Sequence, residues 1–431
     1  MLNLFFVVIA GAIFAYLSKK NILWGLALII IFLPSYLWRF KILSLPSTFL
    51  ELMIVVLFFI FLVYKQGYKL FLKPNLGRQK KWFLILIFWL IISLVAWFYS
   101  PSLKALGLWR AYFLEPLLFF VMLMASLKNS KDYQLLVKAI AILIFWLAIF
   151  AIVQNFTGSN LPAAYNYPRV KRLTSVFSYP NALSLLTAGA SGFLLAYYFF
   201  RKKDWEYIVV GALGLFLSWW SVSQGALVAV VFSLGLLLAV KIYQGLKNQK
   251  HRIFYFVFLL LLLLFIFNTQ TARSFYQQLF HPVLDLQATS IEIRSSQWQE
   301  TWALLKDNWF QGAGLNAYQL KLIPYHRTTW LEIFLYPHNI FLNFWVELGL
   351  LGLLGFLAII YFIAREIRNL FRQKNNLRWP LLIFWLIWLM HGLVDVPYFK
   401  NDLSLLFFLF LALTIKAKYN DNDLQTKQIL V

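Results

Sequence analysis

The chain has 431 residues, of which 62% are hydrophobic and 13% are charged. Soluble domains carry about 25% charged residues, so this composition excludes a soluble globular protein. The net charge of +23 is spread over short basic stretches between long apolar runs, which indicates membrane lipids rather than nucleic acid as the surroundings of the chain. The chain contains no cysteine, so disulfides, thiol nucleophiles and cysteine metal sites are also excluded.

Thirteen apolar runs predict membrane-spanning helices, because a helix needs about 20 apolar residues to cross a bilayer. In chain order the predicted spans are residues 2–17, 21–33, 46–64, 82–98, 108–126, 135–153, 181–200, 207–220, 226–240, 254–267, 337–363, 379–394 and 403–415. We therefore expect an all-α polytopic membrane protein with about 12–13 transmembrane helices, forming a single integral membrane domain over residues 1–431.

Alternate connections between these runs contain most of the Lys and Arg residues. The positive-inside rule places those connections, and the C-terminus, in the cytoplasm. Two longer connections then lie on the outer side, a first extracytoplasmic loop at residues 154–180 and a large one at residues 268–336. The large loop is rich in Trp, Tyr and Leu, so we expect it to fold, partly as helix, into a cap over the bundle.

The large loop contains a predicted amphipathic helix at Ser290–Asp307, followed by a tight turn at Gly312-Ala313-Gly314. The apolar face of this helix is expected to comprise Ile291, Trp298, Trp302 and Leu305. Arg294 falls on the same face, where a guanidinium is costly unless an anion or a hydrogen-bonding partner awaits it. Two interpretations stay open, an anion-binding Arg294 or an Arg294 paired with Glu292 or Glu300.

His338 opens the predicted span at residues 337–363, directly after a proline that suits the first position of a helix. The helix dipole disfavours an imidazolium there, so we expect a neutral imidazole that can accept a proton. Free N–H groups at a helix start also attract phosphate, which favours a general base beside a phosphate-linked donor. The alternative is an interfacial histidine bonded to a carbonyl. Farther along, Glu347 is expected to be structural, and a close-packing ridge is expected at Gly349, Gly352 and Gly355.

The first outer loop contributes Arg169, Lys171 and Arg172, which suit either anionic lipid headgroups or a pyrophosphate. A structural salt-bridged network is expected near the outer end of the twelfth span, where the polar residues are His391, Asp395, Lys400 and Asp402. No Asp-x-Asp or His-x-x-x-His pair lies in an outer loop, so no metal or other cofactor is expected.

Four stretches, taken in chain order, resemble the O-antigen ligase and polymerase family of bacterial envelope glycosyltransferases. They are residues 172–181 (Arg-Leu-Thr-Ser-Val-Phe-Ser-Tyr-Pro-Asn), residues 221–226 (Ser-Val-Ser-Gln-Gly-Ala), Arg294 and Trp298 with Gly312-Ala313-Gly314, and Pro337-His338-Asn339 with Glu347-Leu348-Gly349. The last stretch is the most specific. The region that resembles the family core covers residues 172–363.

The resemblance implies a GT-C-like glycosyltransferase bundle in the bacterial cytoplasmic (inner) membrane, with its active site facing the periplasm. The donor would be a glycan on undecaprenyl pyrophosphate, and the acceptor a hydroxyl of lipid A-core, of a glycan or of a protein. Transfer would need no metal and would invert the anomeric carbon. The resemblance assigns His338 as the general base and Arg294 as a pyrophosphate clamp. Further contacts to the pyrophosphate are expected from Arg172, Arg169, Gln224 and Asn339.

One motif departs from the family, which often has Ser-Arg-Gly where this chain has Ser223-Gln224-Gly225. Gln224 can hydrogen-bond a phosphate but carries no charge, so we expect Arg172, rather than Arg169, to supply the missing cation. A ligase that transfers a finished glycan is the first hypothesis. A polymerase or a protein O-oligosaccharyltransferase with the same chemistry is the alternative. A flippase or exporter of lipid-linked glycans is the non-enzymatic alternative, disfavoured because the candidate residues gather at one face.

Overall fold

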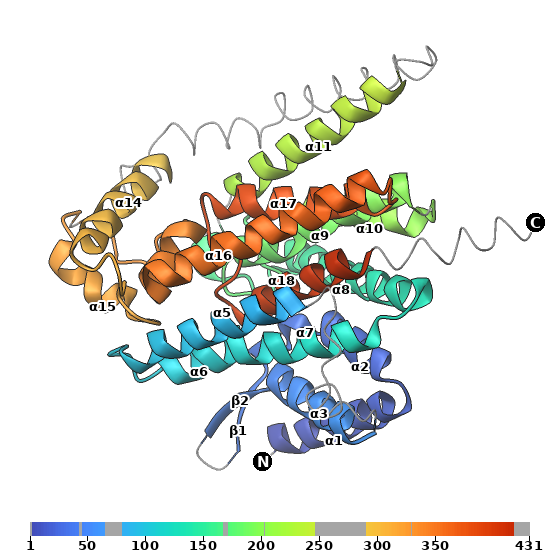
Figure 1. The fold of residues 1–431 in the computed structure, drawn as a ribbon, viewed down its shortest axis with the longest axis horizontal. Coiled ribbons are helices and arrows are strands. Elements are labelled where there is room, and N and C mark those ends of the chain that lie inside the picture. Colours follow the sequence, from blue (N-terminus) through green and yellow to red (C-terminus); the bar gives the residue numbers. More distant parts are fainter. Residues whose placement is uncertain are drawn as a thin grey trace, which may run out of the picture.

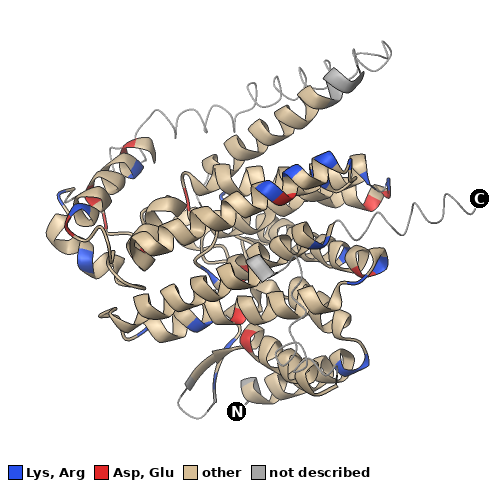
Figure 2. Ribbon diagram, in the orientation of Figure 1, with Lys and Arg blue, Asp and Glu red and all other residues tan. Residues whose placement is uncertain are grey.

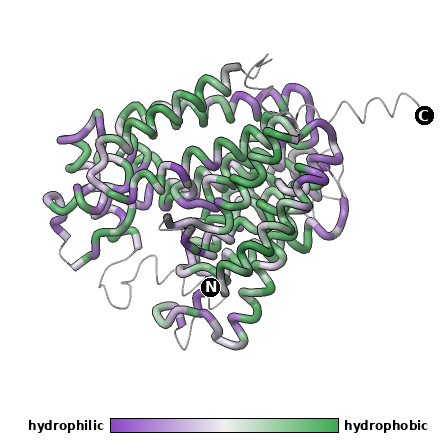
Figure 3. The backbone as a smooth tube through the Cα atoms, turned by 90° about the horizontal axis from the view of Figure 1, so that it is seen from below, coloured by the Kyte–Doolittle hydropathy of each residue, from purple (hydrophilic) through white to green (hydrophobic). Residues whose placement is uncertain are grey.

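The computed structural model describes residues 2–42, 45–64, 80–166, 171–201, 203–245, 290–328 and 330–417. Most of them form helices that lie roughly side by side (Figure 1), and hydrophobic residues predominate along the helix bodies (Figure 3). Within the described part, four helices are long and apolar enough to cross a membrane: Ala105–Ser126, Ser130–Thr157, Pro180–Phe200 and Ile340–Arg372. The predicted all-α polytopic membrane fold is confirmed. The predicted span at residues 254–267 lies outside the described residues.

The N-terminal part combines helices with a short hairpin. It comprises α1 (Leu2–Lys20), α2 (Ile22–Ile31), the 3₁₀ turn η1 (Leu33–Leu37), β1 (Arg39–Ile42), β2 (Leu45–Thr48) and α3 (Phe49–Tyr64). The strands are antiparallel, with Arg39 opposite Thr48. The prediction that a span starts at Pro46 is wrong, because Pro46 lies in β2. Both strands of a two-stranded hairpin are edge strands, where the missing N–H of a proline is tolerated.

The next helices in the chain precede the loop that ends at residue 179. They are α5 (Lys80–Phe98), α6 (Ala105–Trp109), the π-helical turn η3 (Arg110–Leu114), α7 (Glu115–Ser126) and α8 (Ser130–Thr157), followed by the 3₁₀ turn η4 (Ala163–Tyr165). A capping box between Asn129 and Asp132 begins α8, and Gly158 ends it in a left-handed conformation. These two caps explain why α8 is longer at both ends than the predicted span at residues 135–153.

Five helices form the centre of the bundle and bring their ends to the candidate site. They are α9 (Pro180–Phe200), α10 (Trp205–Trp220), α11 (Gln224–Gly245), α17 (Arg378–Gly392) and α18 (Asn401–Lys416). Helices α9 and α18 are buried along most of their length. Gly192 lets α17 approach α9 closely, because a Cβ there would lie 2.4 Å from Ile387 Cδ1. The connections at the ends of these helices carry most of the polar residues discussed below.

Helix α16 (Ile340–Arg372) is broken rather than continuous. Gly349 has φ 72° and ψ −175°, a conformation open essentially to glycine alone. The rings of Phe344 and Phe356 stack with centroids 4.2 Å apart, although a straight helix would separate these residues by about 18 Å. The chain therefore folds back at Gly349, so residues 340–348 lie against the long segment at residues 350–372. The apolar run predicted as a span at residues 337–363 is long enough to cross a membrane, but it is interrupted at Gly349 rather than forming one continuous helix.

The loop that follows α14 (Ser290–Asp307) fills the break in α16. The backbone N–H of Leu350 donates to the Phe310 carbonyl at 2.9 Å, and that of Ala313 donates to the Val346 carbonyl at 2.7 Å. These bonds satisfy backbone groups that the break removes from the helix. A Cβ on Gly312 would lie 2.4 Å from the Val346 carbonyl oxygen, which explains the glycine in this turn.

Two predictions for this helix are changed by the break. The predicted glycine ridge is wrong at Gly349, which is the point of the fold-back. Glu347 is structural, as expected, but its carboxylate accepts a hydrogen bond from the backbone N–H of Asn316 in the outer loop rather than pairing within the bundle. Asn316 in turn donates to Ser102 Oγ at 2.7 Å, beyond the end of α5. Glu347 therefore helps to fix the loop on the bundle.

The cap consists of α14 (Ser290–Asp307), α15 (Tyr318–Leu322) and the 3₁₀ turn η5 (Ile323–Tyr325) at one end of the molecule (Figure 1). The predicted apolar face of α14 is only partly correct, because Ile291 and Trp302 are 52% and 47% exposed. The buried face is instead partly polar, formed by Gln297, Glu300, Thr301, Leu304 and Leu305. Two of its polar members have hydrogen-bond partners for their side chains: Thr301 Oγ1 lies 2.8 Å from the Tyr318 hydroxyl, and Glu300 accepts from the Arg327 and Thr328 N–H groups. Polar burial with partners costs little, so hydrophobic spacing alone gave the wrong face.

Candidate functional site

His338 lies at the start of the folded-back segment in a strained conformation. Its φ of 47° is in the left-handed region, which is uncommon for a residue other than glycine and recurs at functional sites. Asn339 caps the helix that follows, because its Oδ1 accepts from the N–H groups of Phe341 and Leu342 at 3.0 and 3.1 Å. Its Nδ2 donates to the Leu393 carbonyl at 3.0 Å. These contacts hold His338 against the turn that follows α17.

Asp395, in that turn, faces the imidazole. His338 Nδ1 lies 3.4 Å from Asp395 Oδ1, an ion-pair contact slightly longer than a hydrogen bond. The carboxylate also accepts from the Val396 N–H at 2.8 Å and from Asn181 Nδ2 at 3.1 Å. Burial opposes ionisation of Asp395, but the neighbouring His338 and the other donors outweigh it and hold the pKa of this carboxyl below its usual range. An ionised Asp395 favours the imidazole tautomer that carries its proton on Nδ1.

Arg172 extends this network to a second motif. Its Nη2 donates to Asn181 Oδ1 at 3.3 Å, so Asn181 bridges Arg172 and Asp395. Its Nε donates to the Ser221 carbonyl at 3.1 Å. The next residue, Val222, has φ 52°, a genuine outlier for a β-branched side chain. Arg172 thus holds a strained turn that leads into α11.

Arg294 reaches the same turn from the cap. Its Nε donates to the Val394 carbonyl at 3.0 Å and its Nη1 to the Ser290 carbonyl at 3.1 Å. Burial lowers the pKa of this guanidinium, and the charge of nearby Asp395 opposes that change. Glu300, one of the partners that the sequence suggested, instead accepts from the N–H groups of Arg327 and Thr328.

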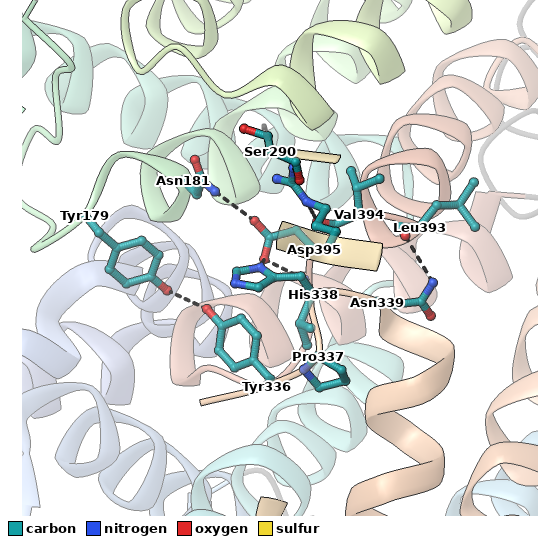
Figure 4. A network of polar contacts seen from close by, with 12 residues as sticks. Tyr179, Asn181, Ser290, Tyr336, Pro337, His338, Asn339, Leu393, Val394 and Asp395 are labelled. Carbon is teal, nitrogen blue, oxygen red and sulfur yellow. Dashed lines mark hydrogen bonds and ion pairs between the residues drawn. The ribbon is translucent and has the colours of Figure 1, made fainter. Parts of the chain in front are cut away.

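Trp298 provides a second link between cap and site. Its Nε1 donates to the Pro337 carbonyl at 2.9 Å, next to His338 in the chain. Arg294 and Trp298, on one face of α14, therefore contact the two segments that carry Asp395 and His338. In Figure 4 the His338 ring is directed at Asp395, which Asn181 approaches from the opposite side.

The motif that departs from the family lies against the same turn. Gln224 begins α11 and is 9% exposed. A Cβ on Gly225 would lie 2.5 Å from Val394 Cγ2 and 3.1 Å from His391 Cδ2. The glycine therefore permits the close approach that brings Gln224 beside the turn after α17. Arg169 lies outside the described residues.

The structure brings together His338, Arg294, Arg172, Gln224 and Asn339 around one turn, residues 393–396. Asp395 was expected in a structural network with His391, yet its contacts belong to the site. Asn181 is the last residue of the stretch at residues 172–181, and the sequence predicts no separate role for it. The sequence signal for both was weak: a lone aspartate in an apolar connection, and an asparagine next to the first residue of a helix. Among the described residues, no group of three His, Asp or Glu side chains is placed to hold a metal ion.

In this polytopic helical bundle a half-buried His338 faces a buried Asp395, Arg294 bonds to the same turn, and Arg172 is linked to Asp395 through Asn181. Residues 208–357 match the family model described as O-antigen ligase. The match confirms the predicted family and contains His338, Arg294 and Gln224, whereas Arg172 and Asp395 lie outside it. A search of curated proteins finds no match. The family implies a glycosyltransferase- or ligase-type enzyme that acts on a lipid-linked glycan and an acceptor.

Proposed function

We propose that the protein transfers a glycan from undecaprenyl pyrophosphate to an acceptor hydroxyl on the outer face of the bacterial cytoplasmic membrane, as an O-antigen ligase. The observation that carries this proposal is the His338–Asp395 pair. With Nδ1 facing the carboxylate at 3.4 Å, Nε2 is the nitrogen that takes the proton of the acceptor hydroxyl. Asp395 holds the ring in place and stabilises the imidazolium that forms.

The reaction we propose is a single displacement. The acceptor oxygen attacks the anomeric carbon, its proton passes to Nε2 of His338, and the bond from that carbon to the pyrophosphate oxygen breaks. The configuration inverts because attack and departure occur on opposite faces of the sugar. The leaving group is an anion, so cations placed beside it lower the barrier, without a step that requires a metal.

Arg294 is the proposed clamp for the leaving pyrophosphate. Two of its donor groups, Nε and Nη1, bond to backbone carbonyls, which fixes the plane of the guanidinium beside the site. Its Nη2 has no hydrogen-bond partner among the described residues and is available to an anion. Arg172 is the proposed second cation in place of the family arginine, with Gln224 as a neutral donor nearby. Arg169 stays a candidate for the same role.

Asn339 is reassigned by its contacts. Its side chain oxygen satisfies the N–H groups of Phe341 and Leu342, which were expected to attract phosphate. We therefore propose that Asn339 positions His338 through the helix cap, and that the arginines bind the pyrophosphate.

The outer location is supported by the distribution of charge. In Figure 2 many Lys and Arg residues gather where α16 ends and α8 begins. The cap, with α14 and α15, lies toward the other end of the long segment of α16 (Figure 1). By the positive-inside rule the basic end is cytoplasmic, which supports a site that faces the periplasm.

The test is transfer by the purified protein in nanodiscs from an undecaprenyl-pyrophosphate glycan, with EDTA present. We expect product from the wild type and a loss of about 10²-fold or more in His338→Ala, because general-base catalysis contributes that much. Arg294→Ala should lose a comparable factor. His326→Ala and Arg327→Ala, which alter the cap away from the turn, are the matched controls. If thermal melting shows that His338→Ala is folded and its transfer is undiminished, the proposed site is refuted.

A further inference from the structure

The connection that carries Asp395 also ends in a second buried charged pair, Lys400 and Asp402. Lys400 is the last residue before α18, and Asp402 lies in the first turn of that helix. The Lys400 side chain turns inward and is 15% exposed, while that of Asp402 is 0% exposed. Neither residue has a role in the chemistry proposed above.

Aromatic rings surround the Lys400 ammonium on several sides. Its Nζ lies 4.5 Å from the ring centroid of Phe177, 5.2 Å from that of Tyr179 and 5.3 Å from that of Tyr36. These distances are typical of cation–π contacts, which stabilise a charge without consuming its N–H donors. Burial lowers the pKa of Lys400, and the charges of Asp402 and Asp395 oppose that change.

Lys400 and Asp402 are too far apart to form a hydrogen bond with each other. Lys400 Nζ and Asp402 Oδ2 are 3.8 Å apart, whereas a charge-assisted hydrogen bond is about 2.7–2.9 Å long. Both atoms are buried, and within the described residues neither has a hydrogen-bond partner. A buried ion pair with unused donors and acceptors is costly. Asp395, a few residues earlier in the chain, is by contrast bonded at both oxygens.

Two tyrosines join this pair to His338. The Tyr179 hydroxyl, from the ring that covers Lys400, lies 3.3 Å from the Tyr336 hydroxyl. The Tyr336 ring centroid is 5.2 Å from that of His338. In Figure 4 the two tyrosines lie on one side of His338, and Ser290 and Val394, which bind Arg294, lie on the other. Tyr179 and Tyr336 thus link the pair to His338 on the side that faces away from the proposed pyrophosphate clamp.

We propose that Lys400 and Asp402, with the rings of Tyr36 and Tyr179, form a subsite that binds a sugar ring of the acceptor through its hydroxyl groups. A hydroxyl accepts from an ammonium and donates to a carboxylate, so it completes both unpartnered atoms at once. A phosphate would meet repulsion from Asp402 and Asp395. Aromatic rings suit the apolar face of a sugar. The proposal rests on the proposed function and narrows its acceptor to a carbohydrate, as in a ligase or polymerase, rather than a protein.

The direct test uses saturation-transfer NMR to detect the binding of methyl glycosides of glucose, galactose and N-acetylglucosamine to the protein in nanodiscs. The protein is the His338→Ala variant, which keeps the subsite but does not need to be active. We expect saturation transfer with it, and loss of the signal when Lys400→Met and Asp402→Asn are added together. This double change removes both charges at once, so no single charge is left buried and unpaired. Tyr325→Phe, in the cap, is the control.

The kinetic test separates this subsite from the proposed function. With the wild-type histidine, Lys400→Met/Asp402→Asn should raise the acceptor KM about ten-fold or more, with the donor KM and kcat little changed. Sugar binding that survives in the folded double variant, or no binding by His338→Ala, would overturn the subsite but leave the transfer chemistry intact. If the double variant does not fold, Asp402→Asn alone is measured in the same way. Transfer to a serine peptide with no sugar binding would also overturn the proposal.

Discussion

The two ends of the folded-back segment at residues 340–348 are held in opposite ways. At one end, side chains fix His338: Asn339 caps the helix and Asp395 faces the imidazole. At the other end, the chain reverses at Gly349, and backbone groups of the outer loop complete the break. The His338 end depends on the side chains of Asn339 and Asp395, whereas the Gly349 end depends on a residue that has no side chain. Changes at the two ends should therefore have different signatures, lost transfer at one and lost stability at the other.

The largest effect on stability is expected at the break. In Gly349→Ala a Cβ would lie 2.3 Å from the Phe310 carbonyl oxygen, in a backbone conformation that alanine avoids. We expect a loss of about 3 kcal/mol or more, from backbone strain and the clash together. The measurement is thermal unfolding in detergent. Gly235→Ala, in α11 where nothing lies within 4 Å, is the control and should be neutral or slightly stabilising. Equal melting of both variants would contradict the fold-back.

A smaller effect is expected where the cap touches the site. Trp298→Phe keeps an aromatic ring but removes the hydrogen bond from the indole N–H to the Pro337 carbonyl. The change should cost about 1 kcal/mol of stability and lower transfer several-fold, because Pro337 positions His338. Trp302→Phe is the matched control, because Trp302 lies in the same cap helix, is 47% exposed, and packs its ring against Trp345 of α16 rather than against Pro337. If the two variants transfer equally well, the cap does not position the histidine.

The smallest effect is expected in the cap alone, as a dependence on pH. Burial raises the pKa of Glu300, but hydrogen bonds from His326 and from the N–H groups of Arg327 and Thr328 outweigh it, so the pKa is lowered. A lowered folded-state pKa contributes stability above the ordinary glutamate value, and that stability is lost as pH falls through the folded value. The size should be about 1 kcal/mol or less, because the cost of burying the carboxylate offsets part of what its hydrogen bonds contribute.

Hydrogen exchange of the Arg327 and Thr328 amides, corrected for intrinsic rates, reports this change. Protection should fall as the pH drops below the ordinary glutamate pKa. Glu300→Gln keeps an acceptor but does not titrate, so its protection should not depend on pH. The same pH dependence in both proteins would show that another group is responsible.

The sequence was sufficient for the helical membrane class and for the family, because both depend on local features. Long apolar runs identify spans wherever they occur. His338 and Arg294 were identified because each is a polar residue at a position where a helix start or an apolar face makes it unusual. The structure places both at one turn, while their chemical roles stay predictions.

The remaining features depend on contacts between distant residues. The fold-back at Gly349 is hidden because an apolar run has the same composition whether or not it is broken. Asp395 was grouped with His391, its neighbour by helical spacing, whereas it bonds to Asn181 and faces His338, both in other segments. The polar face of α14 was missed because Glu300 and Thr301 are buried with partners that only the folded loop supplies.

The central claim is that His338 and Asp395 act as one unit in glycan transfer. The most direct measurement is kcat for His338→Ala, Asp395→Asn and the double variant, with folding checked by thermal unfolding. We predict that each single change lowers kcat by about 10²-fold or more, since an amide no longer favours the required tautomer. The double variant should then be no slower than His338→Ala alone, as for groups that act together. Multiplied losses in the double variant, or an Asp395→Asn variant as fast as the wild type, would contradict the account.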